Sequence, residues 1–83
     1  MATIQTFKER GTGAIVRALK YTSVDEFDSL KSFIGDIYPT ITRAHTRIYE
    51  DNWVIRYDDD RVVFVGCKPN ENCFEKRFEV HSK

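Results

Sequence analysis

The chain lacks a long apolar run and lacks the apolar core of a secretory signal. No stretch of its 83 residues approaches the roughly 20 apolar residues that cross a bilayer. Residues 1–10 are mostly polar, which is unlike a signal peptide. We therefore expect no membrane association and a cytoplasmic location, in which Cys67 and Cys73 are reduced thiols.

The chain also lacks an excess of either charge. Its 13 basic and 13 acidic residues cancel, which disfavours both a general nucleic-acid-binding surface and an acidic DNA mimic. The apolar share of 41% and the aromatic share of 13% are typical of a globular protein. One domain of this size buries only about 60–65% of its unfolded surface. Self-association would add stability, so we expect a homodimer or a higher homo-oligomer.

Metal ligands and partners for a nucleophile are scarce. Cys67 and Cys73 lie six positions apart, and His45 and His81 are not spaced as a pair, whereas structural zinc needs four ligands. A nucleophilic cysteine needs a neighbouring base, and the expected compartment disfavours a disulfide. The Gly-Thr-Gly of residues 11–13 lacks the lysine of a phosphate-binding loop. We expect no metal, no cofactor and no catalytic residue, with Cys67 packed as a small apolar side chain.

Hydrophobic periodicity defines two elements in the first half. Residues 14–21 carry apolar side chains on both faces, which is typical of a strand covered on both sides. Residues 24–34 carry apolar side chains at helical spacing and predict a helix. Ser23 and Glu26 form a capping-box pattern at its start. Gly35 predicts a left-handed stop at its end.

The remaining segments predict an α+β fold with two layers. The polar residues 1–12 indicate a flexible N-terminal arm, and residues 13–81 form a single domain. One helix is expected to pack on a mostly antiparallel sheet of about five strands, in the chain order β-α-β-β-β-β. After the helix we expect four strands, at residues 40–49, 53–57, 61–65 and 74–80. Neither face of 40–49 is convincingly apolar, which suggests an edge strand or one completed by another subunit.

The predicted strand 40–49 carries the sharpest candidate site. On a strand, Arg43, His45 and Arg47 point to one side about 7 Å apart, and such a row can hold phosphate or carboxylate groups. Three aromatic residues are expected to supply stacking surfaces or interface anchors nearby: Tyr49, Trp53 and Tyr57. The alternative, which we favour, is the solvated face of an edge strand whose charges discourage aggregation.

The second half of the chain resembles a widespread family of small phage and prophage proteins. Residues 53–56 (Trp-Val-Ile-Arg), 67–69 (Cys-Lys-Pro) and 74–76 (Phe-Glu-Lys) follow the order of the family pattern, which reads GDWIIKG and then GEFYPCKPDIFEKTYE. In the first half, residues 33–36 (Phe-Ile-Gly-Asp) are similar to the end of the family's helix. The chain departs from the pattern at residues 50–52, where Glu-Asp-Asn replaces Pro-Gly-Asp.

The resemblance spans about residues 14–80 and implies a phage-encoded accessory protein in the cytoplasm of the bacterial host. It implies no catalytic residues. We expect a non-enzymatic protein that binds and inhibits a host or anti-phage defence protein. Two alternatives stay open. One is an oligomeric sponge that sequesters a nucleotide signal through Arg43, His45 and Arg47, and the other is a small nucleic-acid-binding regulator.

Overall fold

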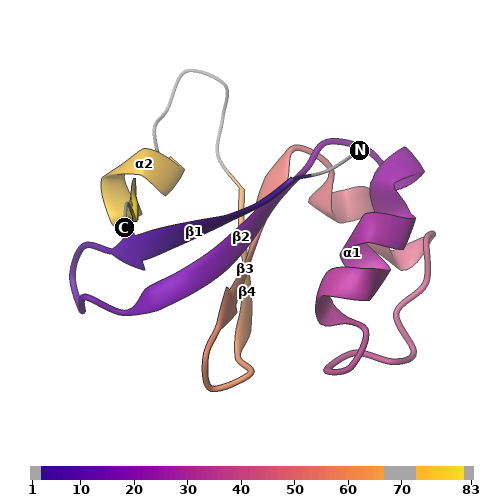
Figure 1. The fold of residues 1–83 in the computed structure, drawn as a ribbon. Coiled ribbons are helices and arrows are strands. Elements are labelled where there is room, and N and C mark those ends of the chain that lie inside the picture. Colours follow the sequence, from indigo (N-terminus) through magenta and orange to yellow (C-terminus); the bar gives the residue numbers. More distant parts are fainter. Residues whose placement is uncertain (1–2, 67–72, 82–83) are drawn as a thin grey trace.

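A five-stranded antiparallel sheet forms the centre of the computed structural model, which describes residues 3–66 and 73–81 (Figure 1). In spatial order the strands are β4 (Val62–Val65), β3 (Asn52–Tyr57), β2 (Ile15–Tyr21), β1 (Ile4–Glu9) and β5 (Phe78–Val80). The helical elements are the 3-10 turns η1 (Val24–Glu26) and η2 (His45–Tyr49) and the helices α1 (Phe27–Ile34) and α2 (Cys73–Arg77). No helix in this described part of the chain is both long and apolar enough to cross a membrane.

The two faces of the sheet carry separate apolar clusters. On one face, α1 contributes Leu30, Phe33 and Ile34 to a buried cluster with Leu19, Tyr21 and Val54 of the sheet. On the other face, Phe74 of α2 joins Phe7, Val16, Ala18, Ile55, Tyr57 and Phe78. Figure 1 shows α1 and α2 on opposite sides of the sheet. The predicted class, an α+β fold with one main helix on an antiparallel sheet of five strands, is confirmed.

The central strand β2 explains the two-sided sheet. Val16 and Ala18 face one cluster, whereas Leu19 and Tyr21 belong to the other, and all four are buried. The exception is Arg17, which lies exposed with its guanidinium 6.0 Å from the ring centroid of Phe33. The prediction of a strand covered on both sides is therefore confirmed for most of β2.

The start of the helical segment is held by side chains. The hydroxyl of Ser23 accepts a hydrogen bond from the backbone N–H of Asp25, at 3.2 Å. The carboxylate of Glu26 accepts from the backbone N–H of Thr22, at 3.0 Å, and from the Thr22 hydroxyl. In the predicted capping box, Ser23 and Glu26 would bond each other's backbone N–H groups. The observed bonds instead satisfy the N–H groups of Thr22 and Asp25 at the same end of the helix. Gly35 is in the right-handed helical region, with φ −65°, so the prediction of a left-handed stop is wrong.

The N-terminal segment is part of the sheet. Residues 4–9 form β1, which pairs with β2 on one side and β5 on the other, so the prediction of a flexible arm over residues 1–12 is wrong for these residues. Only Phe7 among them is apolar and buried, and it packs at the centre of the α2-side cluster. With β1 included, the chain order becomes β-β-α-β-β-α-β.

Two further segments differ from the predicted strands. Residues 40–49 contain turns and η2, and residues 73–77 form α2 before the short strand β5. Phe74 and Phe78 stand four positions apart and stack with ring centroids 5.1 Å apart. A spacing of four places both rings on one side of a strand or of a helix, and in the helix Phe74 also stacks on Trp53 with ring centroids 4.1 Å apart.

Cys73 also departs from the sequence prediction. It is disulfide-bonded, so the prediction of a reduced thiol is wrong for this residue. Cys67, predicted as a packed apolar side chain, lies outside the described residues. The helical turn considered after Pro69 lies outside them as well.

Candidate protein-binding groove

An open groove of about 510 Å³ lies beside the edge strand β4. Its walls come from the connector after α1, from η2 and from β4: Tyr38, Thr40, Ile41, His45, Ile48, Tyr49 and Phe64. The Ile48 side chain is the most exposed apolar group here, with 77% of its surface accessible, and Tyr38 is 43% exposed. Apolar side chains thus line a hollow that faces solvent.

The end of α1 positions the first wall of the groove. The backbone N–H of Tyr38 donates to the Ile34 carbonyl at 2.9 Å, which turns the chain back from the helix. The ammonium of Lys31 donates to the Pro39 carbonyl at 2.6 Å and so ties the connector to α1. Ile34 is buried in the core, so the hydrogen bond from Tyr38 anchors this wall of the groove to the core.

Thr46 fixes the second wall. It is fully buried, and its hydroxyl lies 2.7 Å from the buried hydroxyl of Tyr21. The same Thr46 oxygen donates to the Arg43 carbonyl at 2.8 Å, a local bond that favours a tight turn over an extended strand. With Thr46 turned inward, Ile48 two positions later is left facing outward at the surface.

A ring stack joins η2 to the sheet. The rings of Tyr49 and Phe64 are nearly parallel, with centroids 4.0 Å apart and an interplanar angle of 12°. Both side chains are half-buried and pack against the α1-side cluster. The groove floor is therefore an extension of the hydrophobic core rather than a loop-lined hollow.

The structure separates the residues predicted for the phosphate-binding row. His45 and Tyr49 line the groove, whereas Arg43 is exposed and forms an ion pair with Asp25 at 2.9 Å. Arg47 is exposed on η2. Because residues 40–49 do not form a strand, the predicted row of Arg43, His45 and Arg47 along one strand face is wrong.

The other two predicted aromatic residues lie on the opposite face of the sheet. Trp53 is half-buried and stacks on Phe74, with ring centroids 4.1 Å apart. Tyr57 is buried, and its hydroxyl donates to the Glu9 carboxylate at 3.0 Å. These contacts place Trp53 and Tyr57 in the α2-side core, away from the groove.

Tyr57 belongs to a polar cluster that links β1, β3 and α2. The Glu9 carboxylate accepts from Arg77 Nε at 2.8 Å and from the Thr12 hydroxyl at 2.8 Å. The hydrogen bond from Arg77 is the main reason that the pKa of Glu9 lies below its ordinary value. Burial raises the pKa of Tyr57, and the hydrogen bond to Glu9 adds to this effect. The cluster supports the fold on the face opposite the groove.

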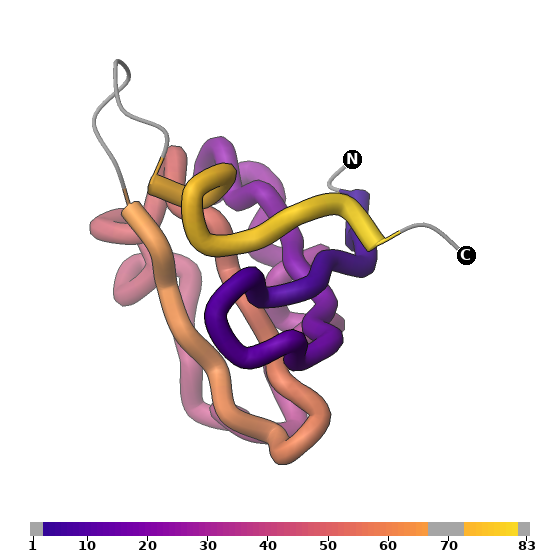
Figure 2. Tube along the Cα trace, turned by 90° about the vertical axis from the view of Figure 1, so that its left-hand side faces the viewer, coloured from indigo at the N-terminus to yellow at the C-terminus, as the bar shows by residue number. Residues whose placement is uncertain are grey.

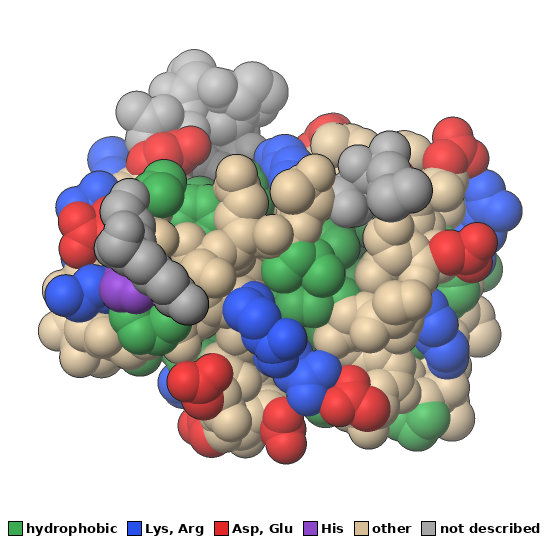
Figure 3. All heavy atoms as spheres, viewed as in Figure 1, with side chains coloured by type: hydrophobic (Ala, Val, Ile, Leu, Met, Phe, Trp, Pro, Cys, Tyr) green, Lys and Arg blue, Asp and Glu red, His purple; other side chains and the backbone are tan. Residues whose placement is uncertain are grey.

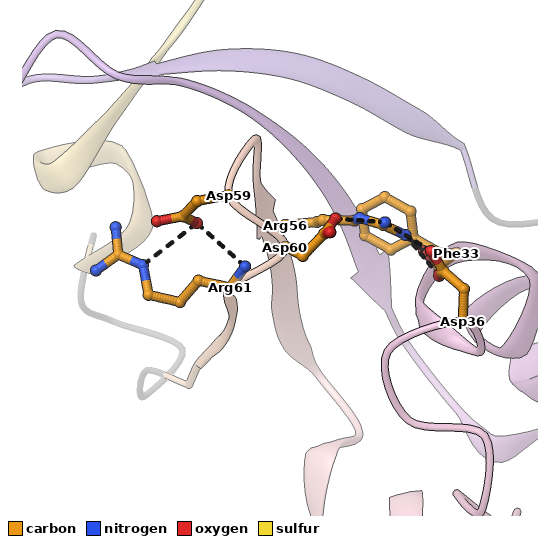
Figure 4. A network of polar contacts seen from close by, with 6 residues as sticks. All are labelled: Phe33, Asp36, Arg56, Asp59, Asp60 and Arg61. Carbon is orange, nitrogen blue, oxygen red and sulfur yellow. Dashed lines mark hydrogen bonds and ion pairs between the residues drawn. The ribbon is translucent and has the colours of Figure 1, made fainter.

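A second polar cluster closes the hairpin against α1 (Figure 4). Arg56 donates to both carboxylate oxygens of Asp36 at 2.8 Å, to Asp60 at 2.9 Å and to the Phe33 carbonyl at 2.9 Å. The hydrogen bonds from Arg56 hold the pKa of Asp36 below its ordinary value. Figure 4 shows Arg56 between Asp60 of the turn and Asp36 after α1, while Arg61 points to Asp59 on the other side. The cluster is structural, because both terminal nitrogens of Arg56 are bonded to groups of the fold, although its buried Nε has no hydrogen-bond partner.

Sequence reasoning missed most of the groove. It did not single out Tyr38, Ile41, Ile48 or Phe64. Ile48 could have indicated the groove, because it is an aliphatic residue between charged and polar neighbours. The strand predicted for residues 40–49 instead made Ile48 one of the side chains that alternate between the two faces of a strand. The groove depends on the packing of η2 against Phe64, a contact that the local sequence does not specify.

The charges on the surface of the described residues are mixed in sign. On the face shown in Figure 3, acidic and basic side chains of the described residues are interspersed rather than gathered in one field. No group of three or more His, Cys, Asp or Glu side chains within residues 3–66 and 73–81 is placed to hold a metal ion.

No protein-family model, no curated protein and no solved structure matches the chain significantly.

Proposed function

We propose that this chain is a non-enzymatic accessory protein of a bacteriophage that binds and inhibits a host or anti-phage defence protein. The binding surface is the groove of Tyr38, Ile41, His45, Ile48, Tyr49 and Phe64. The observation that carries the proposal is the high exposure of the Ile48 side chain, at 77%, next to half-exposed Tyr38. The phage assignment is supported by the family resemblance of residues 14–80.

The composition of the groove favours a protein partner. Binding energy in protein interfaces is concentrated in a few aromatic and aliphatic anchors around a hollow that the partner fills. Tyr38 and Tyr49 supply aromatic rings, and Ile48 supplies an apolar side chain that would leave water on binding. The rigid support of Tyr49 by Phe64 lowers the entropy that ordering the site costs.

Charged groups near the groove favour an orientation of the partner. His45 lines the groove and Arg47 lies exposed two positions after it, whereas the exposed Arg43 is paired with Asp25. A basic side chain beside an apolar centre selects a partner with an acidic residue next to an apolar side chain. The nucleotide sponge required the three basic groups in one row on a strand. Since residues 40–49 do not form that strand, a protein partner is the better proposal.

The test compares two substitutions of exposed apolar residues. Ile48→Asp places a charge in the groove, and Val80→Asp places the same charge at an equally exposed position on β5, at 72% accessibility. Tagged full-length chains are incubated with bacterial lysate, the retained proteins are identified, and binding is then measured with the purified partner. We expect Ile48→Asp to weaken binding at least about tenfold and Val80→Asp to leave it unchanged.

Two results would contradict the proposal. One is a partner that binds the Ile48→Asp chain as tightly as the unchanged chain. The other is binding of a nucleotide, seen as a rise in thermal midpoint on addition of cyclic or linear nucleotides, with no protein partner retained. A salt-sensitive shift of DNA in a gel would instead support the nucleic-acid regulator.

The place of action belongs to the same proposal. We assign it to the host cytoplasm, on the basis of the family resemblance. The disulfide at Cys73 does not support this assignment, because disulfides persist mainly in oxidising compartments. The thiol state of the chain in intact cells is therefore a direct test of the location.

A further inference from the structure

Among the described residues, β4 is an edge strand of the sheet, and its four residues include neither a charged side chain nor a proline. β4 is the outermost strand of the sheet, and Figure 2 shows it in orange along one side of the molecule. Its four residues, Val62 to Val65, are all apolar and half-buried. Natural edge strands are commonly shortened, charged or interrupted by proline, because an unprotected edge pairs with another strand.

The opposite edge of the sheet is protected. β5 has three residues, and its central residue is the charged Glu79, which pairs with Arg10 at 3.3 Å. In the described part of the chain, charge therefore disfavours pairing at β5, whereas the residues of β4 do not disfavour it.

The hydrogen bonds of the hairpin show which groups of β4 face outward. The N–H of Tyr57 donates to the Arg61 carbonyl at 2.8 Å, so this pair of opposite residues is a hydrogen-bonded pair. In an antiparallel ladder such pairs alternate with non-hydrogen-bonded pairs. Val63 and Val65 therefore direct their backbone groups to β3, whereas Val62 and Phe64 direct theirs to the open edge.

We infer that the β4 edge pairs with β4 of a second copy of this chain, antiparallel and around a two-fold axis at Val63. In this register Val62 lies opposite the partner subunit's Phe64, and each such pair exchanges both of its backbone hydrogen bonds. An aromatic residue opposite a β-branched residue is a favourable cross-strand pair. Val63 lies opposite the partner's Val63 on the other face.

Charge and surface area favour a second copy as the occupant. β4 carries no charge, and the chain has no net charge, so two copies approach without like-charge repulsion. A pair of four-residue strands alone buries less than the roughly 800 Å² per partner of a standard interface. The axis is perpendicular to the sheet, so both grooves lie on the same face and flank the axis. The half-buried apolar side chains of β4 itself add surface to the pairing.

The pairing also extends the proposed binding site. Phe64 forms part of the groove wall and stands one position from the axis. The two grooves thus continue into each other across the paired strands and form one longer trough. The pairing itself does not depend on the proposed partner, because it uses the backbone of β4.

The first test removes an outward-facing N–H without touching the ladder. Val62→Pro deletes a donor on the open edge, at the first residue of an edge strand, where proline is tolerated. Val63→Pro deletes an inward donor and should instead lower the thermal midpoint strongly. By light scattering over a concentration series, we expect the unchanged chain to reach twice its monomer mass of 9.7 kDa. We expect Val62→Pro to remain at the monomer mass, with the same circular dichroism spectrum.

The second test fixes the register by cross-linking. Val63→Cys places two thiols on the axis with Cα atoms about 4.5 Å apart, within the range that a disulfide spans. Arg61→Cys, on the same face of the same segment, places them about 14 Å apart. We expect a covalent dimer on a non-reducing gel for Val63→Cys only, with the unchanged chain as the background for the native cysteines.

The outcomes separate this inference from the proposed function. A monomer at every concentration, a dimer that Val62→Pro leaves intact, or equal cross-linking of Arg61→Cys overturns the pairing. A dimer that Val62→Pro disrupts confirms it even if no protein partner is found. A partner that binds the Val62→Pro monomer and loses binding on Ile48→Asp confirms the groove alone.

Discussion

Removing the Glu9 carboxylate is the sharpest test of how β1, β3 and α2 are held together. Glu9 is 9% exposed and accepts hydrogen bonds from Tyr57, Arg77 and Thr12. Glu9→Ala leaves the buried Tyr57 hydroxyl without this acceptor, which costs about 1–3 kcal/mol. Arg77 and Thr12 are exposed enough to be rehydrated and add less.

The total loss is then about 2–3 kcal/mol, which for a domain of this size lowers the thermal midpoint by roughly 8–24 °C. Glu9→Gln keeps the size and one acceptor oxygen but loses the charge, so its cost is about 1 kcal/mol. The matched control is Glu79→Gln on β5, which removes an exposed carboxylate paired with Arg10 and should cost less than about 0.5 kcal/mol.

The pH dependence gives an independent readout of the same cluster. The folded-state pKa of Glu9 is lowered from 4.5, chiefly by the hydrogen bond from Arg77. Its contribution to stability is therefore complete above the unfolded value of 4.5 and is lost as the pH falls through the folded pKa. The difference in unfolding free energy between the unchanged chain and Glu9→Gln should shrink as the pH falls below 4.5.

Denaturant unfolding at several pH values measures both effects. A Glu9→Ala cost below about 1 kcal/mol would refute the buried hydrogen-bond reasoning. A Glu9→Gln difference that stays constant from neutral pH to acid would refute the assignment of the pKa shift to the folded cluster. In either case the link between β1 and α2 would rest on other contacts, among them the Phe7–Phe74 ring pair at 4.8 Å and the hydrogen bond from the Arg10 N–H to the Arg77 carbonyl at 2.8 Å.

Three shorter predictions concern other parts of the molecule. Thr46→Val should cost about 1–2 kcal/mol in urea unfolding, because the buried Tyr21 hydroxyl loses its partner; no change would contradict this. Arg56→Lys should lower the thermal midpoint more than Arg61→Lys, since only Arg56 makes a bidentate carboxylate pair; equal effects would contradict it. Thiol trapping in intact cells should leave Cys73 unlabelled if its disulfide forms where the protein acts, and labelling would show that the thiol is reduced there.

The elements that the sequence predicted are those with a strong local pattern. α1 carries apolar residues at helical spacing, and β2, β3 and β4 are short apolar runs bounded by turn residues. The Asp58–Asp59–Asp60 turn was predicted from its composition, and Asp60 adopts the left-handed region with φ 64°. These segments needed no knowledge of distant contacts.

The elements that the sequence did not predict depend on distant contacts. β1 has one buried apolar residue, Phe7, so its pattern resembles a polar arm until β2 and β5 pair with it. Phe74 and Phe78 fit both a strand and a helix, because a spacing of four is even and is also close to one helical turn. The choice of helix follows from the ring stack of Phe74 on Trp53, twenty-one positions earlier in the chain.

The conformation of residues 45–49 decides whether the groove beside β4 exists. It is as the turn η2 that this segment places Ile48 and Tyr49 on the groove wall beside Phe64. The tight turn keeps Thr46 inside and Ile48 outside, because the Thr46 hydroxyl bonds both Tyr21 and the Arg43 carbonyl. Thr46→Val should therefore weaken partner binding as well as stability, whereas Leu30→Ala, which opens a cavity under α1, should lower stability by a larger amount. If Thr46→Val leaves binding intact while it lowers the unfolding free energy, η2 is held at the groove by the Tyr49–Phe64 stack rather than by the Thr46 hydrogen bonds.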